Sequence, residues 1–194
     1  ETKRKARFTP RGFVQKIGVD YNETFAPVAK MTTLRIFLAL VPILNLYTIQ
    51  LDMKTAFLNA GVEEELYCQP VPDMMHIMEI ILQRATDTHV RQLLQKQVKD
   101  LKRGYVLRIF KALYGLKQAP RNWYLMIDKY LKDTGFKSNL SGVCLYTRIT
   151  GDTHLILLLY VDDVLVAGNR LEECRQFTKE LGKKFRLSNE GELT

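Results

Sequence analysis

The strongest constraint on this chain is an apolar, β-prone stretch that two adjacent aspartates interrupt, LILLLYVDDVLVAG at residues 155–168. Residues 155–161 and 164–167 predict two buried strands joined by a tight turn. Asp162 and Asp163 repel each other there and supply no turn glycine, so they bring the hairpin no structural gain. Paired carboxylates on a rigid hairpin suit a hard divalent cation, which takes oxygen ligands. A solvated acidic turn is the alternative.

A third carboxylate ends another strand-like run, YTIQLD at residues 47–52. A strand that delivers Asp52, beside a hairpin that delivers two carboxylates, is a platform for the two Mg²⁺ ions of nucleotidyl transfer. The alternative is that Asp52 is only a helix N-cap or a strand-end residue.

The charge of the chain indicates the kind of partner. With 29 Lys and Arg against 21 Asp and Glu, the net charge is +8. A polyanionic partner, above all nucleic acid, fits this balance. A basic protein with scattered surface charge is the alternative. The apolar content of 46% and charged content of 26% are ordinary for one globular domain.

The cysteines and the apolar stretches indicate the compartment. Three cysteines without metal-ligand spacing predict buried or free thiols in a reducing environment, namely Cys68, Cys144 and Cys174. No signal peptide is visible, and the longest apolar stretch, at residues 36–46, is too short to span a bilayer. These features predict an intracellular, cytoplasmic protein with no membrane partner.

Hydrophobic periodicity predicts alternating helices and strands. The expected helices cover residues 31–46, with Thr32 or Thr33 as cap and a kink or early end at Pro42, then 120–135, and 171–181 with an end at Gly182. Residues 108–114 read as a strand, and 74–103 as one or two helices. Together with the hairpin, this order predicts an α+β fold, an antiparallel sheet with helices on one face.

Four blocks of the chain, taken in order, resemble the copia-type LTR-retrotransposon reverse transcriptase. They are KARFTPRGFVQKIGVDYNETFAPVAKMTTLR, QLDMKTAFLNAGVEEELYCQP, ALYGLKQAPRNWY and LLLYVDDVLVAG. The resemblance runs from Lys5 to the C-terminus. It implies the RNA-directed DNA polymerase domain of a Pol polyprotein, with a palm and partial fingers. It also implies an RNA template, a DNA primer–template and dNTPs as partners, and a place in a virus-like particle.

The resemblance assigns the catalytic, metal-binding carboxylates to Asp52, Asp162 and Asp163. They would hold two Mg²⁺ ions, with Mn²⁺ as a substitute. One ion would activate the primer 3′-hydroxyl, and the other would hold the triphosphate. Tyr160 and Val161 belong to the same signature and would lie near the primer end, although a core tyrosine is an equally good interpretation of Tyr160.

Further residues match family positions that contact the incoming dNTP. Phe57 corresponds to an aromatic residue below the sugar that selects deoxynucleotides, with a core phenylalanine as the alternative. Gln118 corresponds to a nucleotide-contacting glutamine, with a solvated residue before a helix as the alternative. The remaining positions are the basic residues that grip the triphosphate, Lys5 and Arg7, and a turn whose amides would cradle phosphates, Met53, Lys54, Thr55 and Ala56.

The resemblance also predicts the organisation of the chain. Residues 1–30 would form partial fingers, residues 31–72 and 105–194 a palm-like core, and residues 73–104 an atypical helical insertion. The insertion is either an ordered surface excursion or foreign sequence in a decayed element. The family's first fingers strand and thumb have no counterpart in the 194 residues, so we expect weak, salt-sensitive binding of template–primer and little or no primer extension. A catalytically silent remnant and a nucleotide cyclase on a palm-like sheet are the alternatives.

Overall fold

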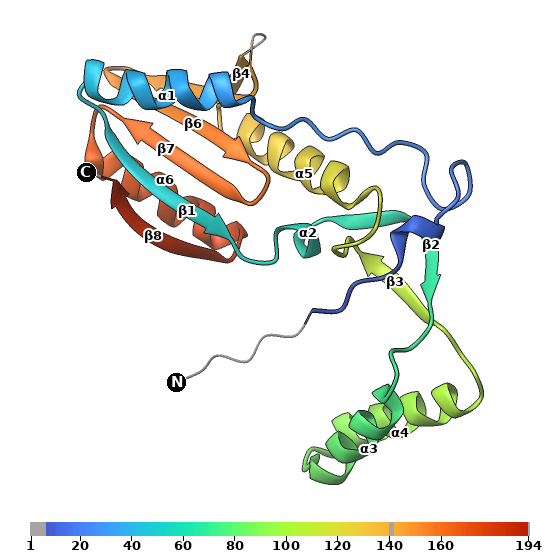
Figure 1. The fold of residues 1–194 in the computed structure, drawn as a ribbon. Coiled ribbons are helices and arrows are strands. Elements are labelled where there is room, and N and C mark those ends of the chain that lie inside the picture. The colour runs from blue at the N-terminus through green and yellow to red at the C-terminus, as the bar shows by residue number, and fades with distance from the viewer. Residues whose placement is uncertain (1–6, 140–141, 194) are drawn as a thin grey trace. The chain divides into compact units, whose positions relative to one another are not determined.

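The computed structural model describes residues 7–139 and 142–193. The chain forms two compact units, one of residues 1–61 with 111–194 and the other of residues 62–110. The first unit contains a six-stranded sheet whose paired strands are antiparallel (Figure 1). Its strands, in spatial order, are β4 (Lys137–Asn139), β5 (Gly142–Thr150), β6 (Thr153–Tyr160), β7 (Asp163–Gly168), β1 (Tyr47–Met53) and β8 (Leu187–Leu193).

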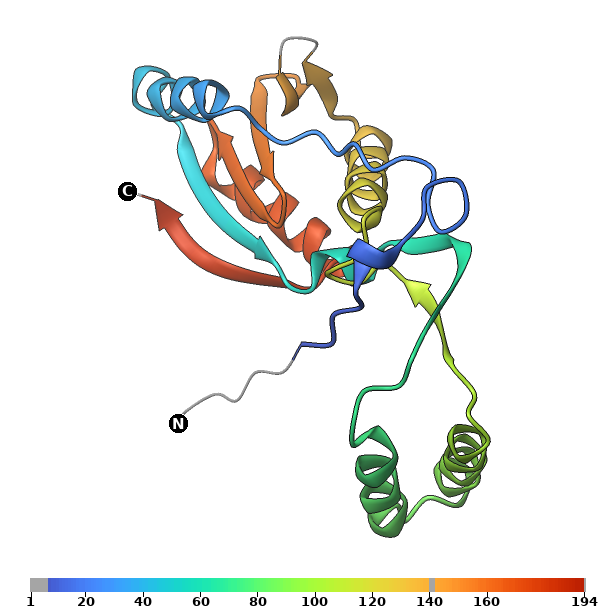
Figure 2. The same ribbon diagram turned by 45° about the vertical axis from the view of Figure 1, so that its right-hand side comes forward.

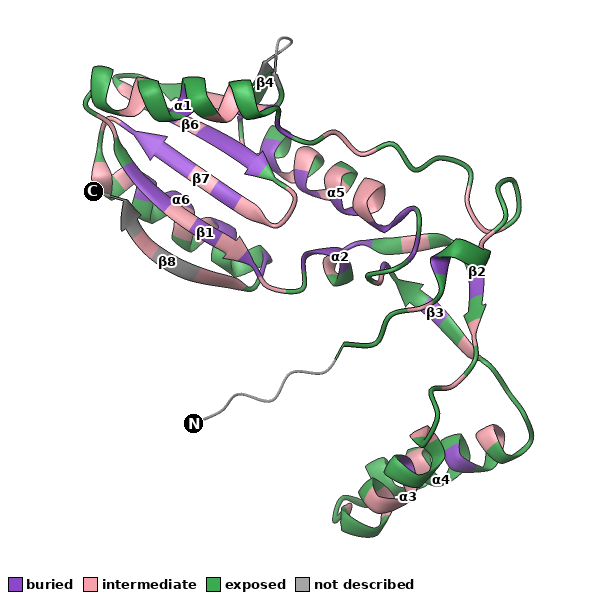
Figure 3. Ribbon diagram, viewed as in Figure 1, coloured by how far each residue is buried: buried purple, intermediate pink, exposed green. Residues whose placement is uncertain are grey.

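The β6–β7 hairpin lies in the middle of this sheet and confirms the predicted pair of buried strands. Six of its apolar side chains are almost fully buried (Figure 3), namely Leu155, Leu157, Leu158, Leu159, Val164 and Val166. Strand β1 was predicted to end at Asp52 and extends one residue further, to Met53. Because Ile49, Leu51 and Met53 alternate along β1 and are all buried, they place Gln50 and Asp52 on the other face of the sheet.

Three longer helices belong to the same unit, α1 (Met31–Ile43), α5 (Ala119–Asp133) and α6 (Leu171–Lys184). Helix α6 contacts β1, β6 and β7, behind which it lies in Figure 1. It continues past Gly182, so the predicted end at that glycine is wrong. Buried Phe177 and Leu181, with Phe185 just beyond the helix, secure the last turns against the core.

Helix α1 begins and ends close to where it was predicted, but its cap differs. Its N-cap is Lys30, without a side-chain capping bond, so the expected cap at Thr32 or Thr33 is wrong. The helix includes Pro42 and ends one residue later, at Ile43. Proline lacks the backbone N–H, and its ring crowds the preceding turn, so the helix ends soon after Pro42.

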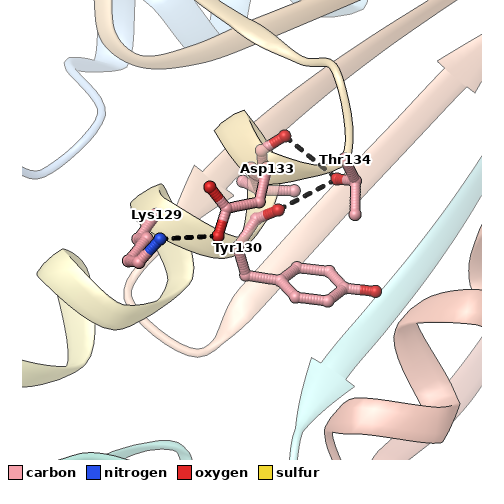
Figure 4. Close-up of polar contacts among 5 residues, drawn as sticks. Lys129, Tyr130, Asp133 and Thr134 are labelled. Carbon is pink, nitrogen blue, oxygen red and sulfur yellow. Dashed lines mark hydrogen bonds and ion pairs between the residues drawn. The ribbon is translucent and has the colours of Figure 1, made fainter.

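Helix α5 begins and ends much as predicted. Pro120 lies in its first turn, where a missing N–H costs little. At its C-terminal end the Thr134 hydroxyl donates to the carbonyls of Tyr130 and Leu131, at 3.0 and 2.9 Å, and Lys129 pairs with Asp133 at 2.7 Å (Figure 4). The Thr134 hydroxyl thus gives a second donor to two carbonyls of the last turn, which also accept the backbone N–H groups of Thr134 and Phe136.

The N-terminal segment of the first unit contains one 3₁₀ turn, η1 (Gly12–Val14), and residues 7–11 form no strand. Gly12 contacts the backbone before α5 so closely that a Cβ atom would lie 1.7 Å from the carbonyl oxygen of Gly115. The Gln15 side chain accepts from the Lys117 backbone N–H at 2.8 Å. Only a glycine at position 12 permits this approach.

The second unit contains most of a two-stranded sheet, β2 (Gly61–Cys68) with β3 (Leu107–Lys111), and two helices, α3 (Met74–Arg84) and α4 (Thr88–Lys102) (Figure 2). The helices correspond to the predicted helical insertion. Their buried side chains are Met78 and Val98, and an ion pair of 2.7 Å joins Glu79 to Lys102. Within residues 7–139 and 142–193, no helix is long and apolar enough to cross a membrane.

Candidate active site

Side chains from four neighbouring strands lie in one row across the sheet. Tyr160 of β6 pairs with Asp163 of β7, Asp163 pairs with Asp52 of β1, and Asp52 pairs with Ser188 of β8. Directly paired residues in antiparallel strands carry their side chains on the same face. The sheet register therefore puts Asp52 beside Asp163, although they are far apart in the sequence.

Asp162 lies in the two-residue turn between β6 and β7. Two-residue hairpin turns need a positive φ at their first position, where glycine is favoured. Val161 occupies that position with φ 58°. Two hydrogen bonds from outside the hairpin hold the turn. The buried Trp123 indole donates to the Val161 carbonyl at 2.7 Å, and the Met53 N–H donates to the Asp162 carbonyl at 2.7 Å.

Each of two carboxylates accepts a hydrogen bond from a hydroxyl group. The Ser188 hydroxyl donates to Asp52 Oδ2 at 2.9 Å, and the Tyr114 hydroxyl donates to Asp162 Oδ2 at 3.1 Å. Burial raises the pKa of Tyr114, and the charge of Asp162 and its hydrogen bond raise that pKa further. Arg7 acts in the opposite direction. The Tyr114 hydroxyl therefore stays protonated and acts as a donor.

A cavity of about 540 Å³ contains the carboxylates of Asp52 and Asp162. Its other lining residues are Arg7, Phe8, Met53, Lys54, Thr55, Leu58, Leu113, Tyr114 and Arg186. Two acidic and three basic side chains thus line one space. Carboxylates suit a divalent cation, and lysine and arginine suit the oxygens of a phosphate. This pairing is what a metal–nucleotide ligand requires.

The donor set fits Mg²⁺ as far as the structure describes it. In residues 7–139 and 142–193, no group of three or more His, Cys, Asp or Glu is arranged to hold a metal ion. Mg²⁺ is usually bound by one or two carboxylates, with substrate phosphates and water completing its octahedron. Asp52 and Asp162 can supply those carboxylates. Asp163 lies beside Asp52 in the register but does not line the cavity, so its role as a ligand stays a prediction.

Only some of the residues predicted to cradle phosphates in the turn after β1 line the cavity. The Met53, Lys54 and Thr55 residues line the cavity, whereas Ala56 is fully buried. The Met53 N–H bonds to the Asp162 carbonyl and the Lys54 N–H to the Arg186 carbonyl, at 2.7 and 2.9 Å. These two amides are therefore already used inside the fold. Because Met53 is buried, the side chains that remain to face a ligand are those of Lys54 and Thr55.

The other predicted nucleotide contacts lie apart from the cavity lining. Phe57 is 6% exposed, and its ring packs on Tyr114 with centroids 4.2 Å apart. Gln118 is buried, where its amide donates to the Asp20 carbonyl and accepts from the Gln15 side chain. The alternative interpretation of Gln118 as a solvated residue is thus not observed. Lys5 lies outside the described residues.

Four residues at this site were not singled out for it by the sequence, namely Tyr114, Trp123, Arg186 and Ser188. Tyr114 and Trp123 belong to the block ALYGLKQAPRNWY, which carried the family resemblance, and that was the available signal. Arg186 and Ser188 belong to no recognised motif. Their contacts come from the pairing of β8 with β1, which the sequence did not indicate.

The mixed fold of helices on an antiparallel sheet, with acidic side chains at a sheet turn, is that of a reverse-transcriptase-like palm. The chain matches the family described as "Reverse transcriptase (RNA-dependent DNA polymerase)" over residues 1–81 and 85–194, and it belongs to this family. The match includes most of the two helices α3 and α4.

Similar proteins include transposon polyproteins of plants and yeast. The chain is 36% identical over 188 residues to the retrovirus-related Pol polyprotein from transposon TNT 1-94 of Nicotiana tabacum, covering 96% of the chain and 12% of the relative. It is 33% identical over 189 residues to that of transposon RE2 of Arabidopsis thaliana, covering 97% and 11%. The transposon Ty1-H Gag-Pol polyprotein of Saccharomyces cerevisiae is 28% identical over 97% of the chain and 9% of the relative. The chain spans about a tenth of the length of these relatives, and the predicted copia-type resemblance is confirmed.

Proposed function

We propose that the cavity of Asp52 and Asp162 is the active site of an RNA-directed DNA polymerase domain of a copia-type element. Its reaction is the transfer of a nucleotide from a dNTP to a primer 3′-hydroxyl on an RNA or DNA template. The observation that supports this most is the lining of one cavity by both carboxylates and by Arg7, Lys54 and Arg186. The family membership supplies the reaction class.

In this proposal different residues orient the carboxylates, offset the charge of the triphosphate and bind the metal ions. Ser188 and Tyr114 fix the orientation of Asp52 and Asp162 through their hydroxyl groups. The three basic side chains offset the charge of the triphosphate. Two Mg²⁺ ions, held by Asp52, Asp162 and Asp163, would supply activation of the 3′-hydroxyl and neutralisation of the leaving pyrophosphate.

The primer end belongs near the hairpin turn in this proposal. Tyr160 is 48% exposed and lies in the same strand row as Asp163 and Asp52, which supports its assignment to the primer side. Val161 presents its backbone at the turn, held by Trp123. Phe57 and Gln118 remain proposed contributors to nucleotide selection; both are buried, and neither lines the cavity.

Template–primer binding rests on charge. The net charge of +8 favours the phosphate backbone without regard to sequence. Such binding releases counterions, so affinity falls steeply with salt concentration. A duplex-binding measurement at 50 and 200 mM salt tests this term independently of catalysis.

Primer extension on an RNA template tests the proposal directly. We expect the 194-residue chain to extend a DNA primer only weakly in the presence of Mg²⁺, and Asp162→Asn to lower that rate at least about 100-fold, since a preorganised charge at the reacting centre is lost. Asp152→Asn is the matched control, because Asp152 is exposed in the turn between β5 and β6, outside the cavity lining. Its rate should stay within about twofold of the parent chain, as for surface changes in general.

Two results would count against the proposal. Extension that survives Asp162→Asn would mean that another site performs the chemistry. Salt-sensitive nucleic-acid binding with no extension, and with no nucleotide or metal binding that depends on Asp162, would favour a catalytically silent remnant of the element.

A further inference from the structure

The helical pair of the second unit carries apolar side chains on more than one face. Helices α3 and α4 have 11 and 15 residues, and helices this short depend on packing for their stability. They contact each other (Figure 2), and their inner face buries Met78 and Val98. Four other apolar side chains are 45–50% exposed, namely Ile77, Ile81, Val90 and Leu93. Exposed apolar side chains that cluster mark interaction sites.

These four residues belong to a regular pattern along each helix, which we call the outer seam. Steps of three and four residues repeat in it, and this spacing keeps side chains on one stripe of a helix that meets a partner helix. The outer seam consists of Ile77, Ile81 and Arg84 in α3, and of Val90, Leu93, Gln97 and Asp100 in α4. Each helix thus has an inner face for its neighbour and a second stripe of the same kind.

Both stripes of the outer seam lie on one side of the helical pair. The opposite side is marked by the ion pair of Glu79 with Lys102, at 2.7 Å, which joins the two helices there. At 3.6 residues per turn, Ile77 and Ile81 point away from Glu79 around α3, and Leu93 points away from Lys102 around α4. The pair therefore has a charged side and an apolar side.

The charges of the second unit indicate what kind of partner covers the apolar side. Residues 62–110 contain seven Lys and Arg against seven Asp and Glu, so this unit has no excess charge to attract a phosphate backbone. The outer seam carries opposite charges at its two ends. Arg84 is the last residue of α3, beside the connection at residues 85–87, and Asp100 lies near the far end of α4.

This distribution of charge is self-complementary. When two copies of such a face meet about a two-fold axis with their ends reversed, Arg84 of each copy lies beside Asp100 of the other, and the apolar residues meet between them. An isologous contact needs this property, because the same surface serves both partners. The face therefore fits a second copy of the chain.

We propose that the outer seam of α3 and α4 is a self-association surface, through which two copies of the chain form an antiparallel four-helix bundle. The proposal does not depend on the polymerase function of the cavity. Four half-exposed apolar side chains per copy make a contact below the standard size of a stable interface. We therefore expect a transient dimer, with a dissociation constant of about 10–100 µM.

Sedimentation velocity of the 194-residue chain between 1 and 300 µM, at 50 mM salt and without nucleic acid, tests the proposal. We expect chiefly monomer at the lowest concentration and chiefly dimer at the highest, about threefold or more above the expected dissociation constant. Ile81→Gln should weaken association at least about 10-fold, because it places an amide in the centre of the apolar contact. Met75→Gln is the matched control, since Met75 is 39% exposed on α3 outside the outer seam, and its dissociation constant should stay within about twofold of the parent value.

Exchange of charges tests the two-fold arrangement itself. Arg84→Glu and Asp100→Arg each bring like charges together at both ends of the contact, so each variant alone should associate at least about 5-fold more weakly than the parent chain. An equimolar mixture of the two variants restores opposite charges at both ends. Association in the mixture should return to within about twofold of the parent value, which a contact within one chain cannot produce. Circular dichroism of each variant shows whether the helices are intact.

Three results would overturn the inference. A parent chain that stays monomeric at 300 µM would leave the face to a different protein. Dimerisation that Ile81→Gln leaves unchanged would place the contact on another surface. A mixture that associates no better than either charge variant alone would exclude the arrangement with reversed ends. None of these measurements uses Mg²⁺, a nucleotide or a primer, so their failure is distinguishable from failure of the proposed polymerase function.

Discussion

In the first unit the β6–β7 hairpin buries Leu155, Leu157, Leu159 and Val166 almost completely, whereas the helices α3 and α4 of the second unit bury only Met78 and Val98. The two regions therefore hold their shapes by different means. A densely buried hairpin can carry a strained turn and adjacent like charges. A helical pair with few buried contacts has low local stability.

This difference explains where the candidate site lies. Positive φ at Val161 is unfavourable for a β-branched residue, and it persists because the hairpin, Trp123 and Met53 all fix the turn. The second unit has a residue of similar φ, Asp73 at 64°, at the start of α3. This conformation needs fewer stabilising contacts at Asp73, because aspartate tolerates the left-handed region.

The largest expected effect is on core packing. Leu157→Ala in β6 should lower the free energy of unfolding by about 2–5 kcal/mol, because it leaves a cavity in a fully packed core. Leu93→Ala in α4 is the matched change, since Leu93 is 47% exposed, and should cost less than about 1 kcal/mol. Urea denaturation measures both. Equal losses would mean that the helical pair contributes to the core as much as the hairpin does.

The thiols give the next largest difference. Burial raises the pKa of Cys144 and of Cys174 to about 11 in the first unit, and raises the pKa of the half-buried Cys68 of β2 in the second. The thiolate is the reactive form, and it forms only as pH rises toward the pKa. At pH 8, iodoacetamide should modify Cys68 at least about 100-fold faster than the buried pair, because both access and ionisation favour it.

Mass spectrometry of peptides during alkylation measures these thiol rates. Cys68→Ser should remove the fast phase and leave the slow one. A fast reaction at Cys144 or Cys174 would show that the sheet unit opens as readily as the second unit.

The same contrast explains what the sequence predicts well. The hairpin was predicted because short runs of Leu, Ile and Val between turn residues are typical of buried strands in a globular chain. The end of α6 was not predicted correctly, because the burial of Phe177 and Leu181 in the core stabilises the helix beyond Gly182. Local signals decide an element's type, and packing decides where it ends.

The candidate site shows the same limit. The positions of Asp52, Asp162 and Asp163 followed from motifs that end or join strands. The partners Tyr114 and Ser188 did not, because each hydrogen bond joins segments far apart in the chain. The use of the Met53 and Lys54 amides inside the fold was likewise invisible, since it depends on where the turn and β8 meet β1. Such contacts exist only once the register of the sheet is set.

A smaller effect is expected from releasing the backbone at the turn. Val161→Gly should raise the free energy of unfolding by about 0.5–1 kcal/mol, because relief of the left-handed backbone outweighs the added chain entropy. Asp73→Gly should change it by less than about 0.5 kcal/mol, since aspartate accepts that conformation. Thermal denaturation of both variants measures the difference. Destabilisation by Val161→Gly would mean that side-chain packing, and not strain, dominates at the turn.

The smallest effect concerns the exposed ion pair of the helical pair. The hydrogen bond from Lys102 and its charge lower the pKa of Glu79, while burial acts in the opposite direction. A lowered carboxyl pKa in the folded state stabilises the fold above the ordinary pKa of the group, and this stabilisation is lost as pH falls through the lowered value. Both side chains are well exposed, at 57% for Lys102 and 39% for Glu79. Solvent therefore screens most of the pair's contribution.

Lys102→Gln should thus move the Glu79 pKa back toward the ordinary glutamate value, with no measurable change in the unfolding midpoint at neutral pH. Carbon-detected NMR titration of the Glu79 carboxyl gives the pKa directly. Lys99→Gln, in the same last turn of α4, is the control that removes a charge without removing the hydrogen bond to Glu79. A marked loss of stability in Lys102→Gln alone would show that this ion pair, rather than Met78 and Val98, holds the two helices together, and the contrast between the two units would then be one of charge as well as packing.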